Sequence, residues 1–254
     1  MPLSNAQLKI LRRLHTRQGR RKSEYFVSEG WRVCREALQA KPEWIEFVVV
    51  SSEADIDCRS ELEAASVSLH EVAPADFAEF AQTETPQGIL AVMRRPESSA
   101  LAAGALLYLV LDRVADPGNF GAILRSCQAA GLKQVAYTSG TTDPWGAKAI
   151  RAGMGAQFRV DLCAFGNLED AQRWFGANGS FDFWLTSPHA GTDCFSDDFA
   201  LERAVIVMGN EAAGPGELAG ARYVSIPMPG TAESLNVAHA TTVLLFEAVR
   251  RGVL

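Results

Sequence analysis

Residues 105–131 read ALLYLVLDRVADPGNFGAILRSCQAAG, and this stretch decides the fold. It opens on a continuous apolar run, Ala105 to Leu111, as expected of a parallel strand buried on both faces. The sequence Asp116-Pro117-Gly118-Asn119 then predicts a type II turn with a positive φ at the glycine. Apolar residues at helical spacing follow the turn. The segment therefore predicts a strand, a tight turn and a helix in succession.

The predicted helix runs from Phe120 to Ala130, with Asn119 as its N-cap and Gly131 as the residue that ends it. Its apolar side chains share one face, so Arg125 points away from the core over small neighbours. A substrate could approach an arginine placed in this way. For the turn and helix taken alone, an ordinary surface arginine beside a capped turn is the favoured interpretation.

Strands and helices alternate through the rest of the chain, which predicts an α/β fold. In the first half, strands are expected over 45–50, 67–72 and 88–93, and helices around 4–14, 31–38, 53–65 and 74–81. In the second half, strands are expected over 135–138, 158–163, 181–186, 204–208 and 223–226, and helices over 144–152, 168–175 and 236–251. The best boundary lies at 94–104, so we expect one domain over 1–95, a linker over 96–104 and a second domain over 105–254.

Composition indicates a globular protein, with 48% hydrophobic and 21% charged residues in a chain of 254. The net charge is −6, yet residues 1–35 carry nine basic and only two acidic groups. A basic arm on an acidic body is a candidate RNA-binding surface, although a solvated helix face is the plainer alternative. The candidate residues are Arg12, Arg13, Arg17, Arg20, Arg21 and Lys22.

Several classes of protein are disfavoured. The five cysteines are widely spaced without a Cys-x-x-Cys pair, so neither a disulfide framework nor a metal site is expected. No apolar run approaches the roughly 20 residues that span a bilayer, and no secretory signal is present, so we expect a cytoplasmic protein. The Gly214–Gly220 segment has the wrong spacing for a dinucleotide fingerprint. The four histidines are scattered and receive no catalytic role.

Two later segments also join a strand to an irregular loop. Residues 204–208 lead into Gly209-Asn210-Glu211-Ala212-Ala213-Gly214, where small residues let a ligand approach the backbone. Residues 223–226 lead into Pro227-Met228-Pro229-Gly230 and then Glu233-Ser234-Leu235-Asn236. Asn236 is expected to cap the last helix, whose surface is apolar over much of its circumference. Such a helix is buried or lies at a subunit interface.

Together the three motifs (116–125, 207–214 and 226–238) resemble those of the SpoU, or TrmH-like, branch of the SPOUT RNA 2′-O-ribose methyltransferases. The resemblance covers about residues 105–254, in the order and spacing of the family. Residues 148–156 are also similar, with glycine at 153 where the family often has serine. The resemblance implies a parallel sheet, a deep trefoil knot near the C-terminus, and a homodimer in which Arg125 of one subunit works beside the cofactor of the other.

The resemblance also implies the cofactor, S-adenosylmethionine, and the residue roles. The catalytic set is Arg125, Asn119, Glu211, Ser234 and Asn236. The cofactor-binding set is Thr186, Met208, Gly209, Ile226, Met228 and Leu235. Because arginine is nearly always protonated, we favour Arg125 as a clamp on an RNA phosphate that helps to accept the hydroxyl proton.

Residues 1–95 resemble, more loosely, the ribosomal-protein-like RNA-binding domain of the family, through the segments 25–30 and 85–91. This points to ribosomal RNA as the substrate. A tRNA 2′-O-methyltransferase, an antibiotic-resistance enzyme acting on one rRNA nucleotide and a non-catalytic RNA-binding assembly factor remain as alternatives.

Overall fold

The computed structural model describes residues 2–254 apart from Asp55 and Ser66. The side chains of Ile56, Asp57, Cys58, Arg17 and Arg21 also lie outside the described part. Contacts divide the chain into two compact units. Unit 1 is Met1–Glu97 with Pro144–Phe158, and unit 2 is Ser98–Asp143 with Arg159–Leu254. The expected division at 96–104 stays a prediction, and residues 144–158, which it assigned to the second domain, make their contacts in unit 1.

Unit 1 is built on a four-stranded sheet in the order β1-β4-β2-β3, antiparallel except for the β2–β3 pair. Its strands are β1 (Tyr25–Glu29), β2 (Ile45–Ser51), β3 (Leu69–Val72) and β4 (Ile89–Arg94). Its helical elements are α1 (Asn5–His15), α2 (Arg17–Arg21), α3 (Trp31–Ala40), η1 (Pro42–Trp44), α4 (Ile56–Ala64), α5 (Pro74–Phe80), α7 (Ala147–Gly153) and η2 (Ala156–Phe158). Strand β1 was not expected from the sequence.

Alternating side chains give the unit 1 sheet two apolar faces. One face packs against α1 and α5, in a cluster that includes Leu14, Val49 and Phe77. On the other face Phe26 contacts Trp145 with a ring-centroid distance of 5.0 Å, and Trp145 meets Trp44 at 5.7 Å. Residues 144–158 are therefore part of the core of unit 1, although about fifty residues of chain separate them from β4.

Unit 2 is built on a seven-stranded sheet in the order β7-β6-β5-β10-β8-β11-β9, and every pairing in it is parallel. The parallel sheet expected from the sequence is thus confirmed. The strands are β5 (Leu107–Leu111), β6 (Gln134–Thr138), β7 (Asp161–Phe165), β8 (Asp182–Thr186), β9 (Thr192–Asp193), β10 (Ala204–Met208) and β11 (Arg222–Ser225). The helices are α6 (Pro117–Ala130), α8 (Leu168–Asn178) and α9 (Val237–Arg250).

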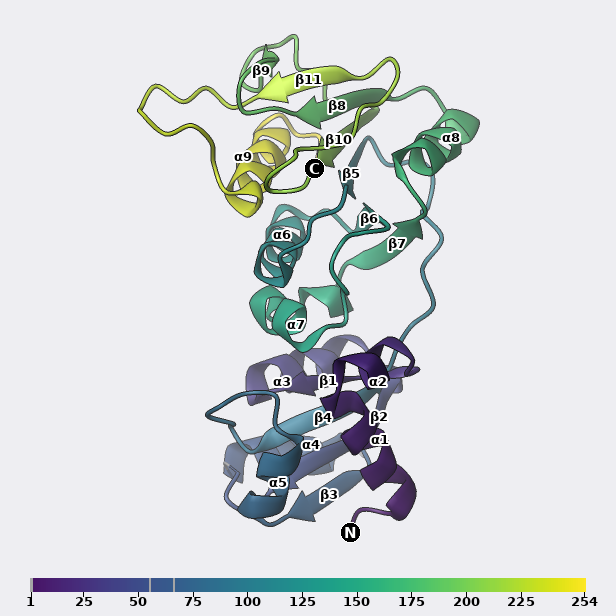
Figure 1. Cartoon of the computed structure of the whole chain (residues 1–254), viewed down its shortest axis with the longest axis vertical. Helices are drawn as coiled ribbons and strands as arrows, with labels where there is room; N and C mark the ends of the chain where they lie inside the picture. Colours follow the sequence, from purple (N-terminus) through teal and green to yellow (C-terminus); the bar gives the residue numbers. More distant parts are fainter. Residues whose placement is uncertain (1, 55, 66) are drawn as a thin grey trace. The chain divides into compact units, whose positions relative to one another are not determined.

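Helices cover both faces of the unit 2 sheet (Figure 1). Helix α8 packs on one face through Phe175, in a cluster with Tyr108 and Val205. Helices α6 and α9 lie side by side, as Figure 1 shows, and a hydrogen bond of 2.7 Å joins Ser126 to Thr242 between them. All five residues of β5 and of β10 are buried, which explains their uninterrupted apolar sequences.

Helix α6 begins three residues earlier than expected. Its N-cap is Asp116, whose carboxylate accepts a 2.8 Å hydrogen bond from the backbone N–H of Asn119, and Pro117 takes the first helical position. Gly118 does not have a positive φ. The predicted type II turn and the Asn119 N-cap are therefore wrong, because an aspartate followed by proline already starts a helix. Gly131 ends the helix in the left-handed conformation, as predicted.

Candidate functional site

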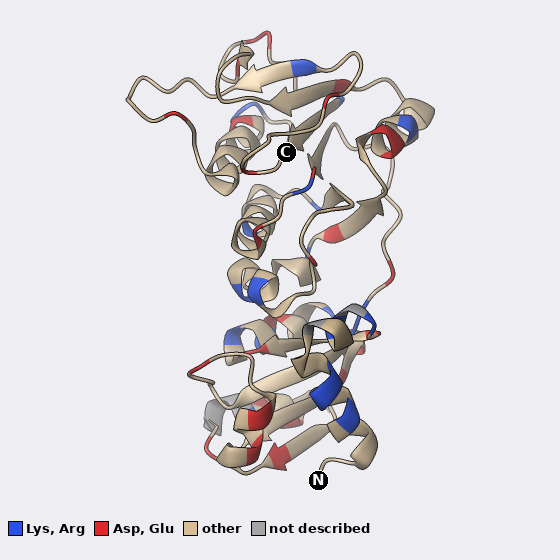
Figure 2. Cartoon of the chain, in the orientation of Figure 1, with Lys and Arg blue, Asp and Glu red and all other residues tan. Residues whose placement is uncertain are grey.

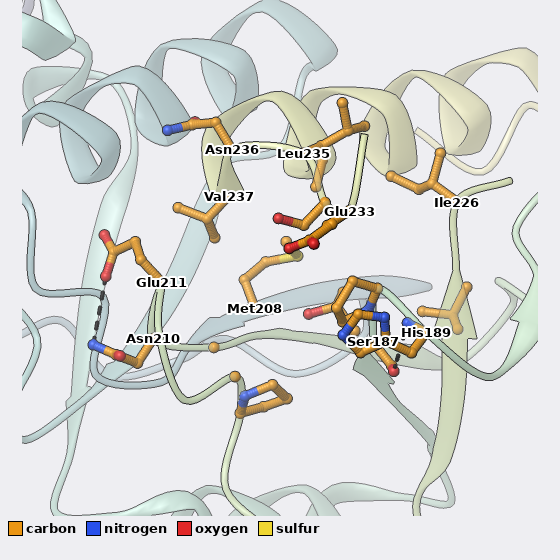
Figure 3. Close-up of a pocket in the computed structure, with 18 of the residues that line it drawn as sticks. Ser187, His189, Met208, Asn210, Glu211, Ile226, Glu233, Leu235, Asn236 and Val237 are labelled. Atoms are coloured by element: carbon orange, nitrogen blue, oxygen red, sulfur yellow. Dashed lines mark hydrogen bonds between the residues drawn. The ribbon is translucent and has the colours of Figure 1, made fainter. Parts of the chain in front are cut away.

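The carboxyl ends of β8, β10 and β11 border a cavity of about 400 Å³ (Figure 3). Loops that follow parallel strands converge at this edge of a sheet, which is where open α/β sheets bind ligands. The volume lies in the range of small-molecule sites, roughly 300–1,000 Å³. The walls come from the segments that follow β8 (186–189) and β10 (208–215), and from 224–244.

All six predicted cofactor-binding residues line this one cavity: Thr186, Met208, Gly209, Ile226, Met228 and Leu235. Met208 is 1% exposed at the end of β10, and the Thr186 hydroxyl donates to the carbonyl of Val207 at 3.1 Å. Thr186 therefore also ties β8 to β10. The structure brings the predicted set together, and it leaves their contact with a cofactor as a prediction.

The path of the backbone requires a glycine at position 209. A Cβ atom at this position would overlap the backbone of Gly214 and Pro215, where the loop folds back on β10. Asn210 and Gly214 close that loop with two backbone hydrogen bonds of 3.1 and 2.9 Å. The expectation that glycine stands here to admit a ligand is thus incomplete, because the close approach comes first from the loop.

A hydrogen-bonded chain connects the three sequence motifs. The Glu211 carboxylate accepts from the Asn119 amide at 2.8 Å and from the backbone N–H groups of Ala115 and Asp116 at 3.3 and 3.2 Å. The Asn119 carbonyl oxygen in turn accepts from the Asn236 amide at 2.8 Å. This chain fixes the direction of the Asn119 amide, because its oxygen and one N–H are both committed.

Glu211 is held as an anion by these donors. Burial raises its pKa, but hydrogen bonds from Asn119 and from backbone N–H groups outweigh that effect, so the pKa lies below its ordinary value. Asn236 accepts from the backbone of Ala238 at 2.9 Å and is the N-cap of α9, as predicted. Ser234 and Asn236 both line the cavity beside Glu211.

Arg125 and Asn119 do not line the cavity. Arg125 is exposed, and it has no hydrogen-bond or ion-pair partner in the part of the chain that the structure describes. It follows Asn119 by six residues along α6, which corresponds to a rise of about 9 Å. The structure therefore brings four of the five predicted catalytic residues together and leaves Arg125 apart.

The basic arm is only partly available to a ligand. Arg20 donates to the carbonyls of Leu14 and His15 at 3.0 and 2.8 Å, so it satisfies the last carbonyls of α1. Arg13 donates to the carbonyl of Lys22 at 2.5 Å. Arg12 and Lys22 are exposed, and the basic side of α1 is visible in Figure 2. The side chains of Arg17 and Arg21 lie outside the described residues.

Sequence reasoning missed a buried network beneath the cavity loop. Asp112 is 3% exposed and accepts from Thr138 at 2.7 Å, from Gly216 N–H at 2.9 Å, and from the Arg113 Nε and Nη2 atoms at 3.0 and 2.8 Å. Burial raises the pKa of Asp112, but these hydrogen bonds together hold it below its ordinary value. An acid directly after a fully buried strand was the available signal.

Sequence reasoning also assigned no role to several other residues of the cavity wall, namely Ser187, Pro188, His189, Glu233, Val237 and Leu244. Glu233 adjoins the predicted residue Ser234, so its position in the third motif could have identified it. His189 follows β8 by three residues, which was the corresponding signal for that residue.

Within the described residues, no cluster of three or more His, Cys, Asp or Glu side chains could hold a metal ion. No helix in that part of the chain has the length and apolar composition needed to cross a membrane. The four cysteines whose side chains are described are buried and form no disulfide with one another: Cys34, Cys127, Cys163 and Cys194.

A parallel α/β sheet with a ligand cavity at its carboxyl edge, joined to a smaller four-stranded unit, defines a two-unit protein with an enzyme-like site. The model of the SpoU rRNA methylase family matches residues 106–246, and that of an MRM3-like substrate-binding domain matches residues 5–91. The chain therefore belongs to the SpoU rRNA methylase family.

Individual relatives agree with this assignment. The 23S rRNA (guanosine(2553)-2′-O)-methyltransferase RlmP of Bacillus subtilis is 31% identical over 95% of both chains. The structure of an AdoMet-bound rRNA methyltransferase from Sinorhizobium meliloti superposes with a TM-score of 0.80 at 31% identity, covering 100% of this chain and 97% of that one. The SpoU methyltransferase AviRb of Streptomyces viridochromogenes, in complex with AdoMet, gives a TM-score of 0.83 at 26% identity, covering 98% and 99%.

Proposed function

We propose that this protein transfers a methyl group from S-adenosylmethionine to a ribose 2′-hydroxyl of ribosomal RNA. One observation carries the proposal: all six residues predicted to bind the cofactor line one cavity, and the chain Glu211–Asn119–Asn236 borders it. Relatives that are methyltransferases, two of them solved with AdoMet, support the same activity. The MRM3-like domain match favours rRNA over tRNA.

The cavity residues fit this cofactor. Met208, Ile226 and Leu235 offer apolar surface to an adenine ring, and the irregular backbone around Gly209 offers polar groups to its edge. Glu211 and Glu233 offer negative charge to a cationic ligand. When bound, S-adenosylmethionine supplies an electrophilic methyl group on a positively charged sulfur.

The protein's own residues must present the hydroxyl and remove its proton, because a neutral hydroxyl is a poor nucleophile. The anionic Glu211 holds Asn119, and one N–H of Asn119 remains for the substrate. Ser234 and Asn236 position the ribose. Arg125 clamps an RNA phosphate that helps to accept the proton, since a guanidinium stays charged and binds phosphate oxygens well.

A homodimer explains the separation of Arg125 from the cavity of its own chain. Helix α9 presents Phe246 and Val249 to solvent, 45% and 37% exposed; they lie three residues apart and so share one face of the helix, and a contiguous apolar patch of this kind marks a protein–protein contact. By resemblance to the family, a second copy seated there would bring Arg125 to the partner's cavity. The deep trefoil knot and the cytoplasmic location belong to the same proposal, by resemblance to the family.

Turnover of Arg125→Ala on rRNA, with AdoMet binding measured in parallel, tests the catalytic assignment. We expect methylation to fall by at least about a hundredfold, the size typical of a lost proton-transfer or charge-stabilising group, while AdoMet binding is retained. Near-normal methylation would refute the role of Arg125. Loss of AdoMet binding would make Arg125 a structural or cofactor residue.

Mixing two inactive variants tests the shared site. Arg125→Ala removes the phosphate clamp, and Gly209→Val distorts the cavity loop because its side chain would overlap the backbone of Gly214 and Pro215. We therefore expect each homodimer to be inactive. In a statistical mixture the mixed dimers keep one intact site, and about a quarter of the wild-type activity should return. A mixture that stays inactive, when both variants are shown to exchange subunits, contradicts a site built from two subunits.

A non-catalytic RNA-binding role is the second candidate, and calorimetry with AdoMet distinguishes it, because a protein of that kind has no need of the cofactor.

The target nucleotide is found by mapping 2′-O-methyl positions in total RNA from cells with and without the gene. A position lost with the gene and restored by the purified protein identifies the nucleotide. Loss of a tRNA position alone would refute the rRNA assignment.

A further inference from the structure

Glu233 stands out in the cavity wall because no described residue pairs with its carboxylate. It is exposed, and within the described residues it makes no hydrogen bond or ion pair. Figure 3 shows it reaching over Met208 toward the interior of the cavity. A carboxylate at the mouth of this cavity, with no cation beside it from the described residues of its own chain, is placed to meet a cation carried by the ligand.

The other residues of the cavity wall add to the negative electrostatic potential around Glu233. Glu211 is the other acid that lines the cavity, and its carboxylate is already occupied by Asn119 and two backbone N–H groups. The described wall contains no lysine or arginine, and its one histidine is His189. The cavity therefore has a negative potential, and Glu233 is the acid still available to a ligand.

We propose that Glu233 makes the cavity distinguish the sulfonium donor from the thioether product. The inference rests on the proposed function. Transfer breaks the bond between sulfur and methyl, leaves the electron pair on sulfur, forms the bond between ribose oxygen and methyl, and releases the hydroxyl proton. The donor thus carries one more positive charge than the product, while their shapes differ by a single methyl group.

Shape separates two such ligands only through one methyl group, which changes binding in an apolar pocket by about 10- to 200-fold. A carboxylate responds to the lost charge directly. Its attraction to the ligand weakens when the sulfur becomes neutral, which favours release of the product and entry of a new donor. Glu233 is thereby assigned as a residue that determines specificity for the cofactor's charge state.

Calorimetry with S-adenosylmethionine, S-adenosylhomocysteine and methylthioadenosine tests the assignment on the wild type, Glu233→Gln and the control Glu202→Gln. Glu202 is an exposed acid of the same unit that does not line the cavity. We expect Glu233→Gln to weaken donor binding about fivefold, the effect of one partly exposed ion pair, and product binding less than twofold. Glu202→Gln should change neither.

Equal weakening of donor and product, with methylthioadenosine unchanged, would overturn the inference and assign Glu233 to the ammonium group that both ligands carry. Unchanged binding of all three ligands would overturn it as well. A wild-type protein that binds no donor would refute the proposed function instead. The salt dependence of the wild type gives a second measurement: donor affinity should fall more steeply with ionic strength than product affinity, and equal slopes contradict the assignment.

Discussion

Replacing Asp112 by asparagine removes the charge at the centre of the network beneath the cavity loop. Four donors surround this carboxylate at 2.7 to 3.0 Å: the Thr138 hydroxyl, the Gly216 N–H and two guanidinium nitrogens of Arg113. An asparagine can keep its oxygen toward Arg113 and Gly216 only by turning its NH₂ toward the Thr138 hydroxyl. The hydrogen of the Thr138 hydroxyl must then point away from residue 112. The oxygen of the same hydroxyl also accepts from the backbone N–H of Arg113 at 3.2 Å.

The magnitude follows from what is lost. The Arg113 side chain is 45% exposed, so its ion pair with Asp112 is screened by water and contributes about 1 kcal/mol or less. The misplaced amide at Thr138 costs about another 1 kcal/mol. Together Asp112→Asn should lower the free energy of unfolding by about 2 kcal/mol.

Urea unfolding followed by far-UV circular dichroism measures this loss, with Asp198→Asn as the matched control. Asp198 is exposed, and its replacement should change stability by less than about 0.5 kcal/mol. Because Gly216 is held by Asp112, we also expect weaker AdoMet binding from a looser loop at 209–216. Wild-type stability in Asp112→Asn, with unchanged AdoMet affinity, would refute the claim that this network supports the site.

Three further predictions follow from the structure. The Glu247 side chain is 3% exposed and lies beside Arg250 and Arg251. These arginines lower its pKa to about 2, although burial opposes the shift. The contribution of the Glu247 carboxylate to stability should therefore be complete above pH 4.5 and lost as the pH falls toward 2. Thermal unfolding of Glu247→Gln should lack this dependence, and equal pH profiles would contradict it. Trp145→Ala should cost about 3–5 kcal/mol in urea unfolding, because it removes a ring that packs on Phe26 at 5.0 Å; a cost below 1 kcal/mol would show that the contact is unimportant. Phe246→Asp should shift the protein to a monomer in sedimentation analysis if α9 forms the proposed interface, and an unchanged mass would exclude that surface.

Most of unit 2 was predictable because its strands are strongly apolar. β10 occupies 204–208 as expected, and α9 begins after its Asn236 cap. The predicted secondary structure was wrong where local sequence preferences for helix and strand are similar in strength. Phe158 was assigned to a strand but lies in a 3-10 helix, and β7 starts only at Asp161. Strand β1 follows a basic stretch and is completed by pairing with β4, a partner distant in sequence.

The site, too, was predictable in part. Motif resemblance identified residues that line the cavity: Thr186 and Met208 end their strands, Gly209 and Ile226 directly follow a strand, and the others lie in the loop before α9. It could not identify the direction of a side chain. The bonds from Asn119 to Glu211 and Asn236 depend on α6 starting at Pro117, and the network around Asp112 depends on contacts with Thr138 and Gly216, which lie far along the chain.

The packing of residues 144–158 in unit 1 restricts how this protein can be cut or recombined. A polypeptide ending near residue 97 would lack Trp145 and Phe158, leaving Phe26 and Trp44 to face water. The chain passes from one unit to the other three times, after residues 97, 143 and 158. An exchange of RNA-binding modules between relatives at a single junction would therefore carry over an incomplete core. A working chimera needs the 144–158 segment from the same parent as the N-terminal unit.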